Sequence, residues 1–396
     1  MRILRSIHTV NPELGGPIES VMQSSGALIG RGHEVEIVSL DRPKDDWVRH
    51  CALKVHALGP GRGNYGYARR FTRWMNERHG AYEAVIVHGL WQYNSLGVWR
   101  VLRKTSTPFF VFPHGMLDPW FKRAYPLKHL KKLLYWSLAE SRVLRDAAAV
   151  LFTSEEERRL ARDSFPFYRC NEVVVNYGTA LPNVDFDRAR EGFFTRFPQL
   201  RGQRFLLFLG RLHEKKGCEL LIDAFASRAG SWRGDRSLEL VIAGPSGDKG
   251  YVEYLQQKAS SLSGVTFTGM LTGSCKWGAF SAADAFMLPS HQENFGIAVV
   301  EALACGTPVL ISNKINIWRE IASDNAGYVE DDDLAGATRL IERWVRVSAD
   351  DRATMKMSAK DCFMRRFEIG RATDSLLAVL DRCVQADDRV TCKESE

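Results

Sequence analysis

Short apolar runs rich in β-branched and aromatic residues alternate with longer amphipathic stretches along the whole chain. The runs have the length of buried strands, and the stretches between them have the periodicity of helices that cover a sheet. In the first half of the chain we expect strands at 3–7, 34–38, 84–87, 109–112, 148–152 and 172–175. A second series begins at 205 and continues at 238–243, 265–268, 285–288 and 309–311. Strands that alternate with helices predict the α/β class with parallel sheets.

The two series of strands predict two tandem Rossmann-like domains, each a doubly wound parallel sheet, that face a cleft. We expect an N-terminal domain at 1–183, a turn-rich linker at 184–203 and a C-terminal domain at 204–370. A last helix, at about 371–386, is expected to pack back on the N-terminal domain. Ligands of open α/β sheets bind at the carboxyl ends of the strands, so functional residues are expected in the loops that follow them.

Composition narrows the class of protein. Of the 396 residues, 45% are hydrophobic and 26% are charged, which is typical of a globular protein. The net charge of +7 favours an anionic partner. The eight cysteines form no CxxC pair, so we expect a reducing cytoplasm rather than a disulfide framework or a zinc site. No apolar run approaches the ~20 residues that span a bilayer, and the basic N-terminus lacks the apolar run of a signal peptide.

The strand at 205–209 is followed by a motif suited to a diphosphate. Gly210 permits close approach of the backbone, and Arg211 can form paired charge-assisted bonds to phosphate oxygens. Lys216 precedes Gly217 at the start of a helix, whose N-terminus itself favours anions. The structural alternative is a solvated basic turn.

A second motif joins a buried strand to a helix and carries two carboxylates. Glu293 and Glu301 would lie on the order of 10 Å apart along a helix, too far to act as an acid–base pair on one bond. They could instead hold two hydroxyl-bearing parts of one elongated ligand, while the amides of Asn294, Phe295 and Gly296 face an anion between them. The apolar neighbours of Glu301 predict partial burial rather than a solvated position. A nucleotide sugar has this layout.

Together these motifs resemble the signature of retaining glycosyltransferase family 4, the group 1 glycosyl transferases. The resemblance rests on Gly210-Arg211-Leu212 with Lys216-Gly217, on Glu293-x7-Glu301 before Cys305-Gly306-Thr307-Pro308, and on Gly15-Gly16-Pro17. It implies the GT-B fold of two Rossmann-like domains.

The resemblance also implies roles for single residues of the C-terminal half. Arg211 and Lys216 would neutralise the diphosphate of the donor. Glu301 would hold the ribose, and Glu293 would contact the donor sugar as a catalytic residue. Fixed cations and amides aimed at the departing diphosphate stabilise the charge that develops there, and such folds are expected to need no metal and no cofactor.

In the N-terminal half the resemblance implies that Gly15 and Gly16 form the loop opposite the donor. His88 and His114 each stand between an apolar strand and a glycine, and the histidine of the family matches His114 better. The ring of His114 could bond a hydroxyl of the donor sugar or position the acceptor, whereas a structural role would be to satisfy a loop carbonyl. We favour function at His114 and a structural role at His88.

The acidic run at 330–333 looks like a metal-binding cluster. It precedes a helical pattern at 334–345, however, and supplies the cap and first-turn charge that a helix needs. No metal is expected there.

The segment 119–145 carries seven Lys or Arg residues and one acidic residue, Glu140, for a local charge of +6. On a predicted helix, one face carries three of its lysines, Lys128, Lys131 and Lys132. Another face carries four leucines, Leu127, Leu130, Leu134 and Leu138. Such a helix could lie on anionic lipid, beside a lipid-linked acceptor. It could equally pack its leucines on the sheet and leave the basic face in water. Both interpretations stay open here.

The leading hypothesis is a retaining transferase that moves a sugar from a nucleotide-sugar donor to a hydroxyl acceptor, with a lipid-linked saccharide as one candidate. Surface polysaccharide or glycolipid biosynthesis is the expected setting, in the cytoplasm or on the inner face of the membrane. One alternative is a nucleotide-sugar epimerase of the same fold, for which we find no acid and base groups. Another is a non-catalytic binder of nucleic acid or a membrane surface, but no nucleic-acid motif is present and no nucleic acid is expected.

Overall fold

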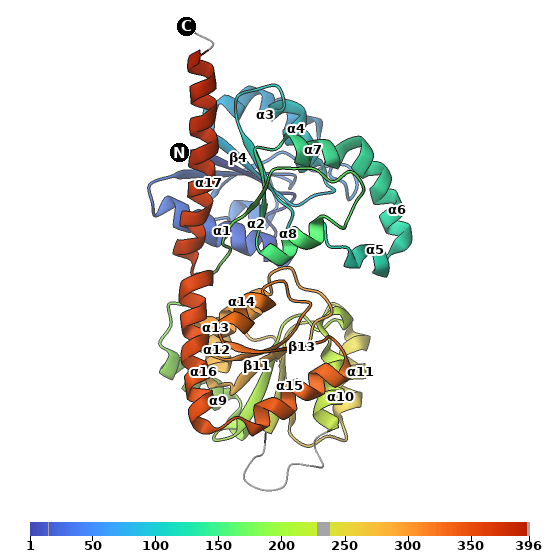
Figure 1. Ribbon diagram of the computed structural model, residues 1–396, viewed down its shortest axis with the longest axis vertical. Coiled ribbons are helices and arrows are strands. Elements are labelled where there is room, and N and C mark those ends of the chain that lie inside the picture. The colour runs from blue at the N-terminus through green and yellow to red at the C-terminus, as the bar shows by residue number, and fades with distance from the viewer. Residues whose placement is uncertain (15, 228–237, 394–396) are drawn as a thin grey trace. The chain divides into compact units, whose positions relative to one another are not determined.

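The computed structural model describes residues 1–14, 16–227 and 238–393 (Figure 1). The chain divides into two compact units. Unit 1 contains Met1–Ala180 together with the chain from Ile369 onward, and unit 2 contains Leu181–Glu368. Each unit is built on one sheet in which every strand pair is parallel, with helices packed on the sheet, so the predicted α/β class with two Rossmann-like domains is confirmed.

The sheet of unit 1 has seven strands in the order β3-β2-β1-β4-β5-β6-β7. Their bounds are β1 Arg2–Ser6, β2 Glu34–Ser39, β3 Lys54–Ala57, β4 Ala84–His88, β5 Phe109–Phe112, β6 Ala149–Phe152 and β7 Glu172–Val174. The central strands β4, β5 and β6 are buried throughout, as strands covered on both faces must be. The strand β3, at one edge of the sheet, was not predicted, because its side chains form no apolar run.

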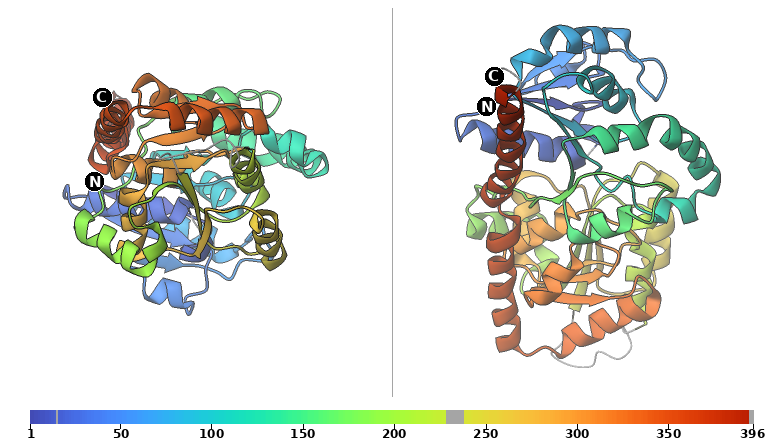
Figure 2. Two further views of the ribbon diagram at one scale, coloured as in Figure 1. Left: turned by 90° about the horizontal axis from the view of Figure 1, so that it is seen from below. Right: turned by 45° about the horizontal axis from the view of Figure 1, so that its top comes forward.

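Helices cover both faces of this sheet. They are α1 Gly16–Ile29, α2 Asp46–Arg49, α3 Arg69–Arg78, α4 Tyr93–Leu102, α5 Trp120–Ala124, α6 Pro126–Tyr135, α7 Ser141–Asp146, α8 Glu155–Ala161 and α17 Ile369–Lys393. On one face, Ile3 and Ile86 share an apolar cluster with Leu376 and Leu380 of α17. The other face packs against α3, α4 and α7. Figures 1 and 2 show α17 beside α1, so the last helix of the chain belongs to the core of the first unit.

The sheet of unit 2 has six strands in the order β10-β9-β8-β11-β12-β13. They are β8 Arg204–Leu209, β9 Leu238–Ala243, β10 Val265–Gly269, β11 Ala285–Leu288, β12 Val309–Ser312 and β13 Gly327–Glu330. The helices are α9 Phe186–Arg196, α10 Cys218–Ala226, α11 Lys249–Ala259, α12 Gly273–Ala282, α13 Ile297–Ala304, α14 Trp318–Ser323, α15 Leu334–Arg346 and α16 Ala349–Cys362. Here too the strand that was not predicted, β13, is a short one at the edge.

The segment 184–203, predicted as a linker, is a packed part of unit 2. Asp185 caps α9, where its carboxylate accepts hydrogen bonds from two backbone N–H groups, each at 3.0 Å. Ala189 and Phe193 are buried, and α9 lies so close to α12 that a Cβ at Gly278 would stand 2.1 Å from the carbonyl oxygen of Ala189. The polar composition of the segment reflects the exposed side of an amphipathic helix.

Candidate functional site

Two loops meet at the carboxyl end of the sheet in unit 2. One follows β8 and the other follows β11, and these strands are neighbours in the sheet. The backbone N–H of His291 donates to the carbonyl oxygen of Lys215 at 2.8 Å, and the hydroxyl of Ser290 donates to the same oxygen at 2.8 Å. The structure therefore brings together the two motifs that are far apart in the sequence.

Gly217 makes this close approach of the loops possible. Its φ of +68° lies in the left-handed region. A Cβ at this position would stand 2.2 Å from the carbonyl oxygen of Pro289 in the second loop. Because of both constraints, glycine is the residue that fits here.

The ammonium group of Lys216 contacts the carboxylate of Glu293 directly. Their side chains are 21% and 15% exposed, so water screens this ion pair less than a pair on the surface. The backbone of Glu293 is held in place, since its N–H donates to the carbonyl of Lys314 at 3.0 Å and its own carbonyl accepts from Asn316 at 3.1 Å. A ligand that has both a phosphate and a hydroxyl can replace this ion pair, because the phosphate can bind Lys216 and the hydroxyl can bind Glu293.

The start of α13 lies next to this ion pair. Gly296, with φ of +71°, turns the chain into the helix. The side chain of Phe295 is 6% exposed and packs edge-on against Phe367, with ring centroids 5.8 Å apart. The side chain of Phe295 is therefore part of the packing of unit 2. The side-chain oxygen of Asn294 accepts a hydrogen bond from Asn316 at 3.4 Å.

Glu301 is 7% exposed, which confirms the burial expected for it. Its carboxylate accepts a hydrogen bond of 2.6 Å from the ammonium group of Lys276 on α12. The ammonium of Lys276 also lies 4.5 Å from the centre of the Trp277 ring. Sequence reasoning missed Lys276, because a single lysine within a helix carries no motif that would distinguish it.

Arg211 extends into solvent at the end of β8. Within the described parts of the chain, no carboxylate lies at ion-pair distance from its guanidinium. The backbone before it is tightly packed, since a Cβ at Gly244 would stand 1.8 Å from the carbonyl oxygen of Gly210. The loop thus presents a cation that has no carboxylate partner among the described residues.

In unit 1 the two predicted histidines lie together at the carboxyl ends of β4 and β5. The Nδ1 atom of His88 is 3.0 Å from Nε2 of His114, and a guanidinium nitrogen of Arg5 is 3.2 Å from Nε2 of His88. A guanidinium can only donate, so Nε2 of His88 accepts and its Nδ1–H donates to His114. The remaining ring proton of His114 is then on Nδ1. This row of three side chains leaves His114 with an N–H group available to donate.

Both histidines are neutral at pH 7. Burial, and then the charge of Arg5, lowers the pKa of His114 to about 4. Burial, Arg5 and His114 lower the pKa of His88 well below its ordinary value. His88 is 4% exposed, and it lines a hollow beside Met116. A neutral His114 can donate a hydrogen bond to a hydroxyl, but it is not an imidazolium acid.

The predicted glycine loop is only partly covered by the structure. Gly15 lies outside the described residues. Gly16 begins α1, and no heavy atom lies within 4 Å of the place that its Cβ would take. Pro17, the next residue, lines a hollow together with His88 and Met116.

A buried carboxylate that the sequence did not mark holds the loop after β4. Glu140 lies in the π-helical turn Trp136–Glu140. It accepts hydrogen bonds from the backbone N–H of Trp91 at 2.8 Å and from the hydroxyl of Ser95 at 2.9 Å. Burial raises the pKa of Glu140 to about 7.

Asp333, at the end of the acidic run at 330–333, caps α15 as predicted, because its carboxylate accepts from the N–H of Gly336 at 2.6 Å; the first turn of α15 itself has no acidic residue. Among the described residues, no three His, Cys, Asp or Glu side chains are grouped as a metal site. In the same part of the chain, no helix is both long and apolar enough to cross a membrane.

Two family matches cover most of the chain. Residues 193–361, in unit 2, match the family described as glycosyl transferases group 1. Residues 15–178, in unit 1, match the family described as glycosyl transferase 4-like domain.

Similar proteins are found among curated relatives and solved structures. The GDP-mannose-dependent alpha-(1-6)-phosphatidylinositol dimannoside mannosyltransferase of Mycobacterium tuberculosis is 26% identical over 400 residues, with 96% of both chains covered. The alpha-monoglucosyldiacylglycerol synthase of Streptococcus pneumoniae is 26% identical over 358 residues, covering 85% of this chain and 77% of that protein. The structure of Anabaena HepE with UDP and glucose has a TM-score of 0.72 at 16% identity, covering 96% of this chain and all of that one. This last likeness shows a shared fold.

Proposed function

The chain belongs to the group 1 glycosyl transferases and has their GT-B fold, and from this premise we propose that it transfers a sugar from a nucleotide-sugar donor to a hydroxyl of a lipid-linked acceptor. Support for the donor comes from HepE, whose structure contains UDP and glucose. Support for the acceptor comes from two relatives whose names refer to phosphatidylinositol and diacylglycerol compounds. Glycolipid or polysaccharide biosynthesis is the corresponding setting.

The contact between Lys216 and Glu293 carries this proposal. The diphosphate of the donor binds Lys216 and Arg211. The carboxylate of Glu293 then loses its contact with Lys216 and binds a hydroxyl of the donor sugar. Glu301 holds the ribose hydroxyls, with Lys276 fixing the orientation of its carboxylate.

In the reaction that we propose, the bond between the anomeric carbon and the diphosphate oxygen breaks, and its electron pair stays on that oxygen. The acceptor oxygen attacks the anomeric carbon from the face that the diphosphate leaves, and its proton passes to the departing phosphate. The configuration is therefore retained. Arg211, Lys216 and the amides at the start of α13 stabilise the growing negative charge. These groups supply the positive charge that a metal ion would otherwise bring, so we propose a metal-independent reaction.

We assign the Nδ1–H of His114 to a hydroxyl of the donor sugar or the acceptor. A neutral ring orients such a hydroxyl without competing for the transferred proton. This role requires the tautomer that the row through His88 and Arg5 imposes.

Thermal shift tests the proposal. A ligand that binds only the folded state raises the melting temperature, so we expect a rise with one family among UDP, GDP, ADP, dTDP and their sugars. The rise should persist in EDTA. NAD and a short DNA duplex serve as controls, and a shift with DNA alone would contradict the proposal.

Variants then test the assigned residues. Lys216→Ala should weaken nucleotide binding by about 10- to 100-fold, since it removes a charge-assisted bond. Glu293→Gln should lower transfer while nucleotide binding is retained. Lys249→Ala, at an exposed position at the start of α11, is the matched control. Nucleotide affinity that is unchanged in both Lys216→Ala and Arg211→Ala would exclude the proposed diphosphate site.

A further inference from the structure

Helix α6 and the π-helical turn after it direct a row of leucines into solvent. Leu127, Leu130, Leu134 and Leu138 are 81%, 65%, 67% and 61% exposed. They are spaced three or four residues apart and share one face of the helix. Single exposed leucines are ordinary, whereas a contiguous row marks a surface that binds something. The alternative in which these leucines pack on the sheet is wrong.

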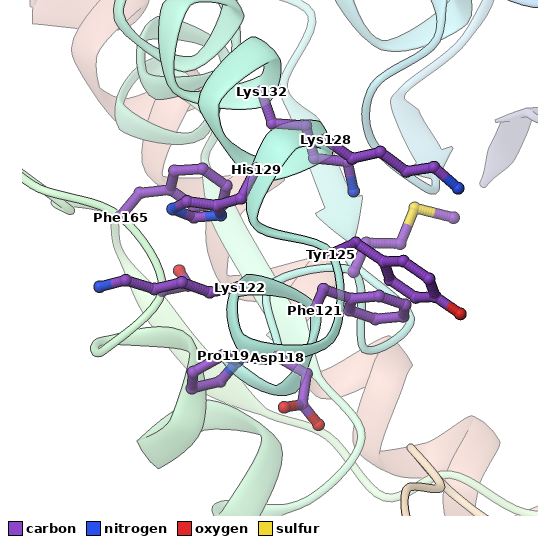
Figure 3. A pocket seen from close by; sticks show the side chains of 11 residues that line it. Asp118, Pro119, Phe121, Lys122, Tyr125, Lys128, His129, Lys132 and Phe165 are labelled. Carbon is purple, nitrogen blue, oxygen red and sulfur yellow. The ribbon is translucent and has the colours of Figure 1, made fainter. Parts of the chain in front are cut away.

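The opposite face of α6 anchors the helix in unit 1. Leu133 packs against the core, and Trp136, directly after α6, is 2% exposed. The ring of His129 stacks on Phe165, with centroids 4.8 Å apart, and Figure 3 shows the two rings side by side. The leucine row is therefore the outer face of a helix that is already fixed in place.

Lysines without carboxylate partners surround this row. Lys131 is exposed and stands four residues after Leu127 and three before Leu134, so it borders the row. No acidic residue occurs between 119 and 139. In the chain as described, the ammonium groups of Lys122, Lys128, Lys131 and Lys132 have no carboxylate within ion-pair distance.

Between α5 and α6 lies a pocket whose polar lining includes Lys122, Lys128, His129 and Lys132, together with one carboxylate, Asp118 (Figure 3). The ammonium of Lys128 is 4.7 Å from the centre of the Tyr125 ring, and that of Lys132 is 4.6 Å from the ring of Trp91. Burial and the charge of Lys128 lower the pKa of Lys132. An anion in this pocket would relieve the repulsion between the two cations.

We infer that α5 and α6 form a docking surface for an anionic lipid bilayer. The leucine row enters the boundary between headgroups and acyl chains, and the lysines around it bind lipid phosphates. A bilayer supplies both an apolar phase and negative charge. A second copy of this chain would instead bring the same uncompensated lysines face to face. The inference concerns unit 1 and does not depend on the sugar-transfer reaction.

Vesicle sedimentation with the full chain tests this inference. We expect binding to vesicles of phosphatidylcholine mixed with phosphatidylglycerol, a decrease of this binding as NaCl rises, and weak binding to phosphatidylcholine alone. Leu130→Gln/Leu134→Gln should weaken binding by about tenfold or more. Lys128→Glu/Lys131→Glu should abolish it with the leucines in place.

Matched variants keep the result interpretable. Leu334→Gln/Met357→Gln changes side chains that are 45% and 63% exposed in unit 2 and should bind vesicles as the wild type does. Lys44→Glu/Lys104→Glu is the corresponding charge control at exposed positions of unit 1. All variants should keep the wild-type melting temperature and its shift with nucleotide, which separates this inference from the proposed function.

Three results would overturn the inference. One is a wild-type chain that does not bind the mixed vesicles, and another is wild-type binding by Leu130→Gln/Leu134→Gln. The third is a wild-type dimer in light scattering that this double variant dissociates, since the partner of the row would then be a second copy.

Discussion

Glu140 and His114 both lie in unit 1, but their titrations change its stability in opposite directions. The pKa of Glu140 is raised from 4.5 to about 7, so the folded state binds its proton more tightly than the unfolded state does. Its contribution to the free energy of unfolding is complete below pH 4.5 and is lost as the pH rises through 7. The pKa of His114 is lowered from 6.5 to about 4, so stability is lost as the pH falls through that range.

Glu140→Gln isolates the first effect. Glutamine can still accept from the N–H of Trp91 and can donate to the hydroxyl of Ser95, but it does not ionise. Between pH 5 and pH 8 the wild type should lose about 2–3 kcal/mol of unfolding free energy relative to this variant. Denaturant unfolding of both chains at the two pH values measures the difference, and the histidines cancel because both chains have them. A difference that does not change with pH would show that Glu140 is not the group that titrates.

The sequence indicates the chemistry of a single residue where a motif surrounds that residue. It does not do so where the residue interacts with a partner that is distant in the chain. Lys216 and Glu293 stand in motifs whose chemistry can be inferred from their neighbours in sequence. Lys276, Arg5 and Glu140 act on partners that are 25, 83 and 49 residues away. Only the topology of the sheets brings those groups together.

At the scale of elements, Gly217 sets the spacing between the loop after β8 and the loop after β11. Gly217→Ala should lower the stability of unit 2 and also the affinity for nucleotide, because a Cβ pushes Pro289 and with it the loop of Glu293. Gly202→Ala is a matched control, since its φ of +78° is equally left-handed but nothing lies within 4 Å of its Cβ. We expect about 1 kcal/mol of destabilisation in the control, from backbone conformation alone, and more in Gly217→Ala.

Denaturant unfolding and nucleotide titration of the two glycine variants check this expectation. Equal losses of stability together with unchanged nucleotide affinity would mean that the loops do not depend on this contact.

Hydrophobic periodicity predicted elements better than it predicted their orientation. It identified the central strands of both sheets and the edge strands β7 and β10, but not the opposite edges β3 and β13, whose short sequences contain no apolar run. It also predicted an amphipathic helix around 127–138. It could not decide which face turns inward, because Leu133, Trp136 and His129 serve as the anchor and leave the longer row of leucines outside.

At the scale of the whole molecule, unit 1 is built from two separate parts of the chain. A chain that ends after Glu368 lacks Leu376, Val379 and Leu380, which pack against the sheet of unit 1. Three buried side chains of this kind contribute on the order of 5–8 kcal/mol, comparable to the stability of a whole domain. We therefore expect unit 1 to unfold in the truncated chain while unit 2 stays folded.

Hydrogen exchange followed by peptide analysis measures the effect of this truncation for each unit. A chain that ends at 385 retains all three side chains and should protect unit 1 as the full chain does. Protection of unit 1 in the chain that ends after Glu368 would contradict the prediction.

The return of α17 to unit 1 also bears on how the protein is made. On the ribosome the first 180 residues emerge well before the helix that completes their sheet, and the whole of Leu181–Glu368 is synthesised in between. At about 5–20 residues per second this interval lasts roughly ten seconds or more. The second unit can fold during translation while the apolar surface that α17 covers in unit 1 is still exposed. Unit 1 therefore begins to form before unit 2 and is completed after it.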